Sequence, residues 1–178
     1  ELEFIPGDDT PELLSDRLLC IQQYIPLTYN TTVHGFIDYF TVRNRDYTRA
    51  MQRKKDLYFP LFEKYLAKYN LPDELKYLSI IESGLNPRAI SRARAVGLWQ
   101  FMPGTGRYFG LQTDWYIDDR MDPEKSTEAA CRYLKQLHTI FGDWELALAA
   151  YNSGPGTVRK AVRKSGYKKS FWEVYPHL

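Results

Sequence analysis

Apolar residues recur at three- and four-residue intervals along most of the chain, which is the pattern of helices that bury one face. One such stretch runs from Val33 to Phe40. A longer one covers residues 45–69, and Pro60 within it is expected to divide or kink the helix. No comparable stretch alternates apolar and polar residues. The pattern therefore predicts a mainly α fold with few or no short strands.

Capping residues mark the ends of several predicted helices. Thr10-Pro11-Glu12 begins a helix over residues 11–23, and Asp122-Pro123-Glu124 begins one that reaches about Phe141. Asp143 caps a helix that continues to Asn152, where Ser153-Gly154-Pro155-Gly156 ends it. A polar loop is predicted over residues 84–97. Further short helices are expected at residues 72–83, 98–101, 103–109, 157–165 and 170–175.

We expect an N-terminal extension with one helix over residues 1–30 and a main domain over residues 31–178, together forming one compact unit. The chain has 178 residues, which is enough to bury a sizeable core. It contains 24 basic and 22 acidic residues, a balance that argues against nucleic-acid binding. Basic clusters at residues 49–55 and 159–169 are typical of solvated helix faces, and they could also favour an anionic polymer such as the cell wall.

The residues that usually bind metals are few and scattered. His34, His138 and His177 show no ligand spacing, and the two cysteines, Cys20 and Cys131, lie far apart in sequence. We therefore expect no metal site and no cofactor. For the cysteines, a single disulfide and two buried thiols are both compatible with the sequence. No segment approaches the roughly 20 apolar residues of a membrane-spanning helix.

Glu82 occupies an unusual place for a charged residue. With Leu75 and Leu78 it follows i, i+3, i+7 spacing, which puts its carboxylate in the apolar stripe of the predicted helix. It also lies at the C-terminal end, where the helix dipole and apolar neighbours both raise a carboxyl pKa. Such a group can remain protonated near neutral pH and donate a proton to a glycosidic oxygen. By spacing alone, however, a solvated carboxylate at a helix end is the more frequent outcome.

Four sequence blocks change that balance, because they occur together and in order. They are Glu82-Ser83, Ser91 nine residues later, Gly97-Leu98-Trp99-Gln100-Phe101-Met102-Pro103, and Ala150-Tyr151-Asn152-Ser153-Gly154-Pro155-Gly156. Together they resemble the lytic transglycosylases. The resemblance is closest to the membrane-bound lytic murein transglycosylase D group, since Trp99 precedes Gln100 and Asp119-Arg120-Met121-Asp122-Pro123 follows. It implies a lysozyme-like helical domain.

The resemblance also implies roles for individual residues. Glu82 is similar to the general acid that later acts as base, and five residues are similar to groups that bind substrate: Ser91, Gln100, Met102, Tyr151 and Asn152. In the family, Met102 would lie beneath the bound sugar and Tyr151 beside the catalytic acid. Two plainer interpretations stay open, in which Asn152 is a helix C-cap and Met102 fills the core.

The activity that the resemblance implies is cleavage of the β-1,4 bond between N-acetylmuramic acid and N-acetylglucosamine in peptidoglycan. The reaction consumes no water, because the C6 hydroxyl of the muramic acid attacks C1 and forms a 1,6-anhydro end. Two alternatives are a goose-type lysozyme-like hydrolase and a catalytically idle peptidoglycan-binding module. Glu82 is expected to be partly buried, with a raised pKa and no second carboxylate in reach.

The substrate also sets the expected partners and location. Peptidoglycan glycan strands are the expected partner, nucleic acid is not, and the chain is expected to be a monomer. A periplasmic location in bacteria, with or without association with the outer membrane, follows from where the substrate lies. Any membrane association would come through parts absent from this chain.

Overall fold

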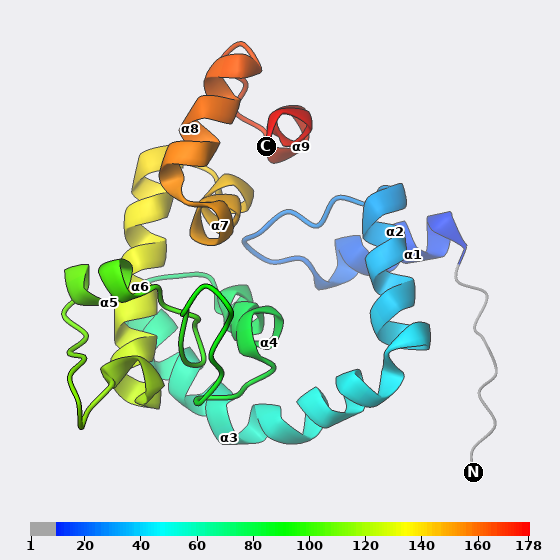
Figure 1. Cartoon of the computed structure of the whole chain (residues 1–178). Helices are drawn as coiled ribbons and strands as arrows, with labels where there is room; N and C mark the ends of the chain where they lie inside the picture. Colours follow the sequence, from blue (N-terminus) through cyan, green and yellow to red (C-terminus); the bar gives the residue numbers. More distant parts are fainter. Residues whose placement is uncertain (1–9) are drawn as a thin grey trace. The chain divides into compact units, whose positions relative to one another are not determined.

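The computed structural model describes residues 10–178, so the first nine residues of the predicted extension lie outside the described residues. Within residues 10–178 the secondary structure is almost entirely helical (Figure 1), and β pairing is limited to three isolated bridges. The predicted mainly α fold is therefore confirmed. None of the described helices combines the length and the apolar character needed to cross a bilayer.

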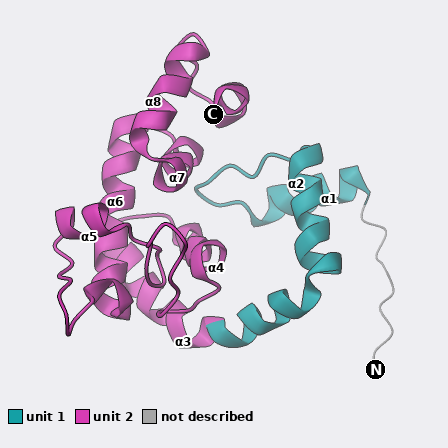
Figure 2. Ribbon diagram, viewed as in Figure 1, with its two compact units in different colours: residues 1–54 teal, residues 55–178 magenta. Residues whose placement is uncertain are grey.

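The chain forms two compact units, residues 1–54 and residues 55–178, with the boundary inside α3 (Arg45–Tyr69) (Figure 2). The first unit contains α1 (Pro11–Ile21), α2 (Thr31–Asp38) and a π-helical turn (Tyr39–Arg43) before α3 begins. Thr10 and Asn30 cap α1 and α2 through their side chains. The predicted domain boundary at residue 30 stays a prediction.

Pro60 does not divide α3, which remains one helix from Arg45 to Tyr69. Proline lacks the N–H that would bond to the carbonyl of Asp56 one turn earlier. Both Pro60 and Asp56 are exposed, so water can satisfy that carbonyl. The expected break is absent because the proline lies on the solvated side of the helix.

The second unit begins with the remainder of α3 and contains six further helices and three short 3₁₀ segments among the described residues. The α-helices are α4 (Leu78–Ser83), α5 (Pro103–Tyr108), α6 (Pro123–Phe141), α7 (Trp144–Ser153), α8 (Pro155–Lys164) and α9 (Phe171–Val174). The 3₁₀ segments are Asp73–Tyr77, Asp119–Met121 and Tyr175–His177. The predicted starts of α6 and α7 are confirmed, since Asp122 and Asp143 cap them.

Two predictions before α5 need correction. The helix predicted over residues 98–101 is wrong, because these residues form a turn closed by reciprocal backbone hydrogen bonds between Val96 and Phe101, at 3.1 and 3.0 Å. The helix predicted over residues 72–83 is present, but its first part is 3₁₀ and only the last six residues are α-helical. Leu75 donates to the carbonyl of Pro72 three residues earlier, which sets the tighter winding.

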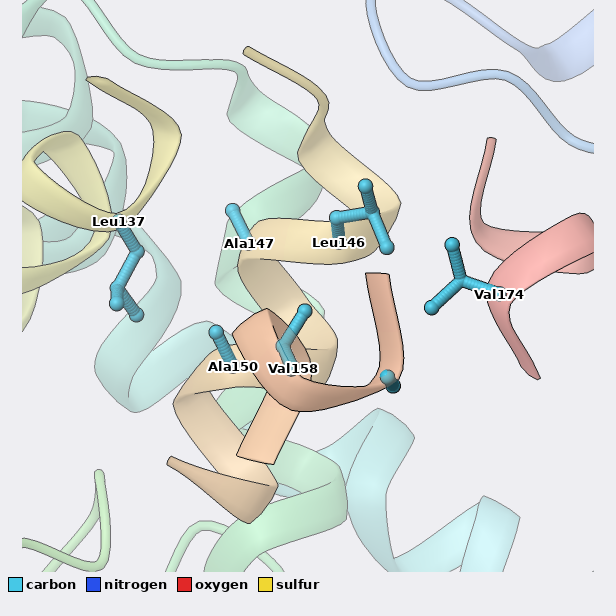
Figure 3. Packing of buried hydrophobic residues seen from close by; sticks show 7 residues of the cluster. Leu137, Leu146, Ala147, Ala150, Val158 and Val174 are labelled. Atoms are coloured by element: carbon cyan, nitrogen blue, oxygen red, sulfur yellow. The ribbon is translucent and has the colours of Figure 1, made fainter. Parts of the chain in front are cut away.

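The core of the second unit lies among α6, α7 and α8. Leu137, Leu146, Ala147 and Val158 from these helices are buried together, and Figure 3 shows how they face one another. Alanines on α7 let the neighbouring helices approach closely. This packing fixes the direction of α7, which carries Tyr151.

Trp99 forms a second centre of packing in the same unit. Its ring is fully buried against Phe62 of α3, with the ring centroids 4.9 Å apart. The indole N–H donates to the hydroxyl of Thr127 on α6, at 2.9 Å. The turn that contains Trp99 is thereby anchored to two helices that are distant from it in sequence.

Both cysteines are free. Cys131 is buried on α6, where burial raises the pKa of its thiol to about 12, and Cys20 is exposed on α1. The structure therefore has no disulfide between them, and the alternative of two buried thiols holds for Cys131 but is wrong for Cys20. Within residues 10–178, no group of three His, Cys, Asp or Glu side chains is arranged to hold a metal ion.

Candidate active site

Glu82 is the penultimate residue of α4, whose end is set by Gly84 in a left-handed conformation (φ 60°). Its side chain is partly buried, and burial raises its carboxyl pKa from 4.5 to about 7. No carboxylate among residues 10–178 contributes to this shift. The predictions that Glu82 is partly buried and has a raised pKa are confirmed.

Two serines fix α4 to the turn at residues 97–101. The hydroxyls of Ser79 and Ser83 each donate to the backbone carbonyl of Leu98, both at 2.9 Å. Ser79 is completely buried, so its hydrogen bond forms away from water. Because the two serines are one helical turn apart, they hold the segment that carries Glu82 on one side of the turn.

Tyr151 approaches the same turn from α7. Its phenol donates to the carbonyl of Trp99 at 2.7 Å. Burial, followed by the charge of Glu82, raises the pKa of Tyr151 well above 10. Tyr151 is therefore a neutral hydrogen-bond donor near Glu82. Successive carbonyls of this turn, those of Leu98 and Trp99, bring α4 and α7 together.

Gln100 follows in the same turn, in a left-handed backbone conformation (φ 48°) that is uncommon for a residue with a side chain. Its amide nitrogen donates to the carbonyls of Ala89 (3.2 Å) and Gly97 (3.0 Å). The side chain thus closes the loop at residues 84–97 onto the turn. This uncommon backbone conformation lies in the turn that receives α4 and α7, and such conformations are frequent at functional sites.

One cavity of about 340 Å³ brings together four of the six predicted site residues. Its lining comes from the end of the turn, from α5 and α6, and from the end of α7: Gln100, Phe101, Met102, Thr105, Tyr133, Tyr151, Asn152, Ser153 and Gly154. Glu82 is not part of this lining, but it is coupled to it through the electrostatic contact with Tyr151. The cavity and the acid are therefore neighbouring parts of one region.

The structure decides between the open interpretations of Met102 and Asn152. Met102 is 44% exposed, so it does not fill the core. Asn152 lies inside the last turn of α7, and the residue after that helix is Gly154 (φ 86°), so Asn152 is not the C-cap. Both side chains line the cavity.

Ser91 lies elsewhere in the loop and is absent from the cavity lining. Its hydroxyl accepts the backbone N–H of Ala95 at 3.0 Å, and its own N–H donates to the Ala95 carbonyl at 2.9 Å. These bonds make Ser91 a closing residue of a tight turn. Its predicted contact with substrate stays a prediction.

Arg120 is a residue whose importance the sequence did not reveal. Its guanidinium is buried, pairs with both carboxylate oxygens of Asp118 (2.9 and 2.7 Å) and donates to the carbonyls of Arg94 (3.0 Å) and Phe101 (3.2 Å). The Arg120 carbonyl also lies so close to Gly97 that an added Cβ would be 1.8 Å from it. The sequence marked Arg120 only as part of the block Asp119-Arg120-Met121-Asp122-Pro123. A buried arginine in a short 3₁₀ segment has no periodic signal, so its contacts are known only from the structure.

Comparison with known proteins gives the family of this chain. The family model "Transglycosylase SLT domain" matches residues 60–173. The chain is 39% identical over 137 residues to the membrane-bound lytic murein transglycosylase D of Escherichia coli K12, covering 75% of this chain and 30% of that protein. It is 30% identical over 125 residues to the soluble lytic murein transglycosylase of the same organism, covering 67% of this chain and 19% of the relative. The chain thus spans less than a third of the length of these two relatives.

Solved structures give the same result for the fold. The 70 kDa soluble lytic transglycosylase of Escherichia coli matches with a TM-score of 0.57 and 28% identity, over 67% of this chain and 20% of that one. The lytic transglycosylase Slt of Pseudomonas aeruginosa matches with a TM-score of 0.55 and 27% identity, over 66% of this chain and 20% of that one. Their lysozyme-like helical fold is the predicted one. By the match to its family model, this chain belongs to the Transglycosylase SLT domain family.

Proposed function

We propose that this chain is a lytic transglycosylase, which cleaves the β-1,4 bond between N-acetylmuramic acid and N-acetylglucosamine in peptidoglycan without consuming water. The observation that carries the proposal is Glu82, partly buried at the end of α4 with a pKa of about 7. At neutral pH such a group is present in both protonation states. It can therefore act first as an acid and then as a base in the same reaction. Membership of the SLT domain family supports the same reaction.

In the first step, protonated Glu82 donates its proton to the glycosidic oxygen while the bond from that oxygen to C1 breaks. The N-acetylglucosamine leaves with a free C4 hydroxyl. Most glycosidases use a second carboxylate to stabilise the positive C1 centre. Since no carboxylate of the described residues shifts the pKa of Glu82, we assign that role to the acetamido group of the muramic acid, through an oxazolinium intermediate.

In the second step, Glu82 is a carboxylate and accepts the proton of the C6 hydroxyl on the same sugar. The C6 oxygen attacks C1, the bond from C1 to the acetamido oxygen breaks, and a 1,6-anhydromuramoyl end forms. Glu82 is again protonated and ready for the next bond. Every proton that leaves the enzyme in the first step returns in the second, so the reaction needs no water and no cofactor.

The cavity beside Glu82 would hold the sugars. We propose that Gln100, Met102 and Asn152 contact the substrate from the lining, with the Met102 side chain packed beneath a ring. Tyr151 would stay a neutral phenol near Glu82, since its raised pKa prevents ionisation at neutral pH, and its hydroxyl oxygen can accept a hydrogen bond while its O–H donates to the Trp99 carbonyl. Ser91 would contact the substrate from the loop at residues 84–97.

The proposal is tested by digesting purified peptidoglycan with the wild type and with Glu82→Gln, followed by mass analysis of the products. Anhydro products are expected from the wild type, with a loss of about a thousandfold or more in the variant, since it has no proton to donate or accept. Glu145→Gln is a matched control, because Glu145 is also a partly buried carboxyl with a raised pKa, on α7. It is expected to keep wild-type activity.

The products also separate the rival functions. Reducing ends in place of anhydro ends would show a lysozyme-like hydrolase, in which water attacks C1. Sedimentation of the wild type with peptidoglycan but no cleavage would show an idle binding module. Undiminished cleavage by Glu82→Gln would contradict the role of Glu82 in either reaction.

We further propose that the chain acts in the bacterial cell envelope, as a monomer in the periplasm, where peptidoglycan is accessible. The names of the relatives, which are murein transglycosylases, support this location. Fractionation of the producing cell, with the protein detected by antibody, tests the location. Gel filtration of the purified chain tests the monomeric state.

A further inference from the structure

A second and larger cavity lies in the unit formed by residues 55–178, with a volume of about 620 Å³. Its apolar wall comes from α6, α7 and α8 and includes Phe141, Leu146 and Val162. None of its lining residues belongs to the cavity beside Tyr151. We call it the basic cavity, because four cations also line it: Arg159, Arg163, Lys168 and Lys169.

The charged residues that line this cavity are all positive. No acidic residue is part of its lining. Lys168 pairs with Glu173 at 3.2 Å, whereas Arg159, Arg163 and Lys169 have no ion-pair partner among residues 10–178. The chain as a whole is nearly neutral, with a net charge of +2, so these cations are a local concentration of positive charge.

The arrangement on α8 is not explained by helix stability alone. Cations in the last turn, such as Arg163, interact favourably with the helix dipole. Arg159 lies one turn earlier, where a second cation at i, i+4 spacing is mildly unfavourable. This i, i+4 spacing puts both guanidinium groups on the same face of α8, in the lining that also contains the apolar wall.

The two cavities are connected by the helices that they share. On α6, Tyr133 lines the candidate active site and Phe141 lines the basic cavity, which is eight residues or about 12 Å along the axis. On α7, Tyr151 and Leu146 are about 8 Å apart along the axis. The two cavities therefore lie at different levels along the same two helices, α6 and α7.

We propose that the basic cavity binds the acidic peptide stems that peptidoglycan strands carry, with Arg159 and Arg163 pairing with stem carboxylates and small apolar side chains resting on the apolar wall. This inference rests on the proposed function, since it assigns a second contact to the same substrate. Guanidinium groups suit carboxylates because two parallel hydrogen bonds can form. The cavity is open to solvent, since its four cations are exposed, but its concave apolar wall suits short side chains better than it suits the broad surface of a bilayer.

The test uses two double variants on the same helix. Arg159→Ala/Arg163→Ala removes two cations from the basic cavity. Lys160→Ala/Lys164→Ala removes two exposed cations from the adjacent positions of α8, which do not line the cavity. The change in charge and the new residue are the same in both, and alanine is a strong helix former, so both variants are expected to fold.

The direct probe is the free stem peptide, released from purified peptidoglycan with an amidase, with binding measured by calorimetry. The wild type and the lysine double variant are expected to bind it equally, and the arginine double variant about tenfold more weakly or worse. In cleavage assays, the arginine variant is expected to lose activity on peptide-bearing strands and to match the wild type on strands stripped of peptide. Equal losses in both double variants, or no peptide binding by the wild type, would overturn the inference.

A parallel measurement addresses an anionic membrane as the other occupant of this cavity. Sedimentation with phosphatidylglycerol vesicles is expected to show no difference between the two double variants. If the arginine variant alone loses vesicle binding and keeps its affinity for the peptide, the cavity is a lipid site and the inference is wrong. If the wild type binds the peptide but cleaves no strand, the proposed function fails while the peptide site stands.

Discussion

The segment at residues 84–121 and the helices at residues 123–164 belong to the same unit but are stabilised in different ways. The helices begin at capping aspartates and bury an apolar face, so their local sequence and their packing agree. The earlier segment contains one short α-helix and is held by side chains that bond to distant carbonyls. Substitutions of the groups that hold this segment should therefore disturb the candidate site, whereas substitutions in the helices outside the cavity lining should mainly change stability.

Gly97→Ala tests this difference with the largest expected effect. The added Cβ would meet the Arg120 carbonyl oxygen at 1.8 Å, and the backbone conformation (φ 88°) is itself unfavourable for alanine. We expect a loss of at least about 5 kcal/mol in the free energy of unfolding, measured by urea denaturation. Gly156→Ala on α8 is the matched control, since nothing lies within 4 Å of its Cβ position. This control should be neutral or slightly stabilising. An equal loss in the free energy of unfolding at both positions would show that the earlier segment is packed no more tightly at Gly97 than α8 is at Gly156.

Arg120→Ala is expected to cost about 4 kcal/mol in the free energy of unfolding, because it leaves the carboxylate of Asp118 without its buried partner. It should also lower activity per folded molecule, since the carbonyls of Arg94 and Phe101 lose their donor. Urea denaturation and kcat measured on the folded fraction give the two effects separately.

Leu134→Ala on α6 provides the comparison for Arg120. Leu134 is fully buried, and its truncation should cost about 3 kcal/mol. Activity per folded molecule should stay close to the wild type, because its side chain does not line the candidate site. A similar loss of kcat in both variants would mean that the two regions do not differ in function.

Glu82→Gln should change the pH dependence of stability. The pKa of Glu82 is about 7 in the folded protein and close to 4.5 in the unfolded chain, so the folded state binds more protons between these values. In the wild type, its contribution is present below about pH 4.5 and is lost as the pH rises to about 7. The variant should therefore gain up to about 3 kcal/mol relative to the wild type between pH 4.5 and pH 8.

Urea denaturation at these two pH values measures that gain. Glu12→Gln, at an exposed position on α1, is the control for the loss of a carboxyl group as such. A constant difference between Glu82→Gln and the wild type at both pH values would be evidence against the raised pKa.

Asp143→Ala is expected to have the smallest effect. The Asp143 carboxylate accepts the backbone N–H of Leu146 at 2.8 Å and begins α7. Loss of this cap should cost about 1 kcal/mol, and Asp143→Asn should restore most of it. Because α7 carries Tyr151, kcat reports whether the effect reaches the site. A fall in kcat as large as that for Arg120→Ala would show that the helices also determine the geometry of the site.

The sequence by itself determined where most helices begin and end, because caps, prolines and glycines act within a few residues. Asp122, Asp143 and Gly154 are examples. The same local signals failed at residues 98–101, where the conformation depends on a bridge between Val96 and Phe101 and on the burial of Trp99. The ordered blocks made Glu82 the candidate acid, but they did not show what surrounds it.

Only the tertiary structure decided how the site is assembled. Two successive carbonyls, of Leu98 and Trp99, receive Ser79 and Ser83 from α4 and Tyr151 from α7. These contacts join residues up to 52 positions apart, and they form only when the helices pack around the turn. The pKa of Glu82 has the same origin, since desolvation depends on what the folded chain places around the carboxyl. The residue type and the sequence spacing can indicate a candidate acid. The burial of its carboxyl group, however, depends on how the whole molecule packs.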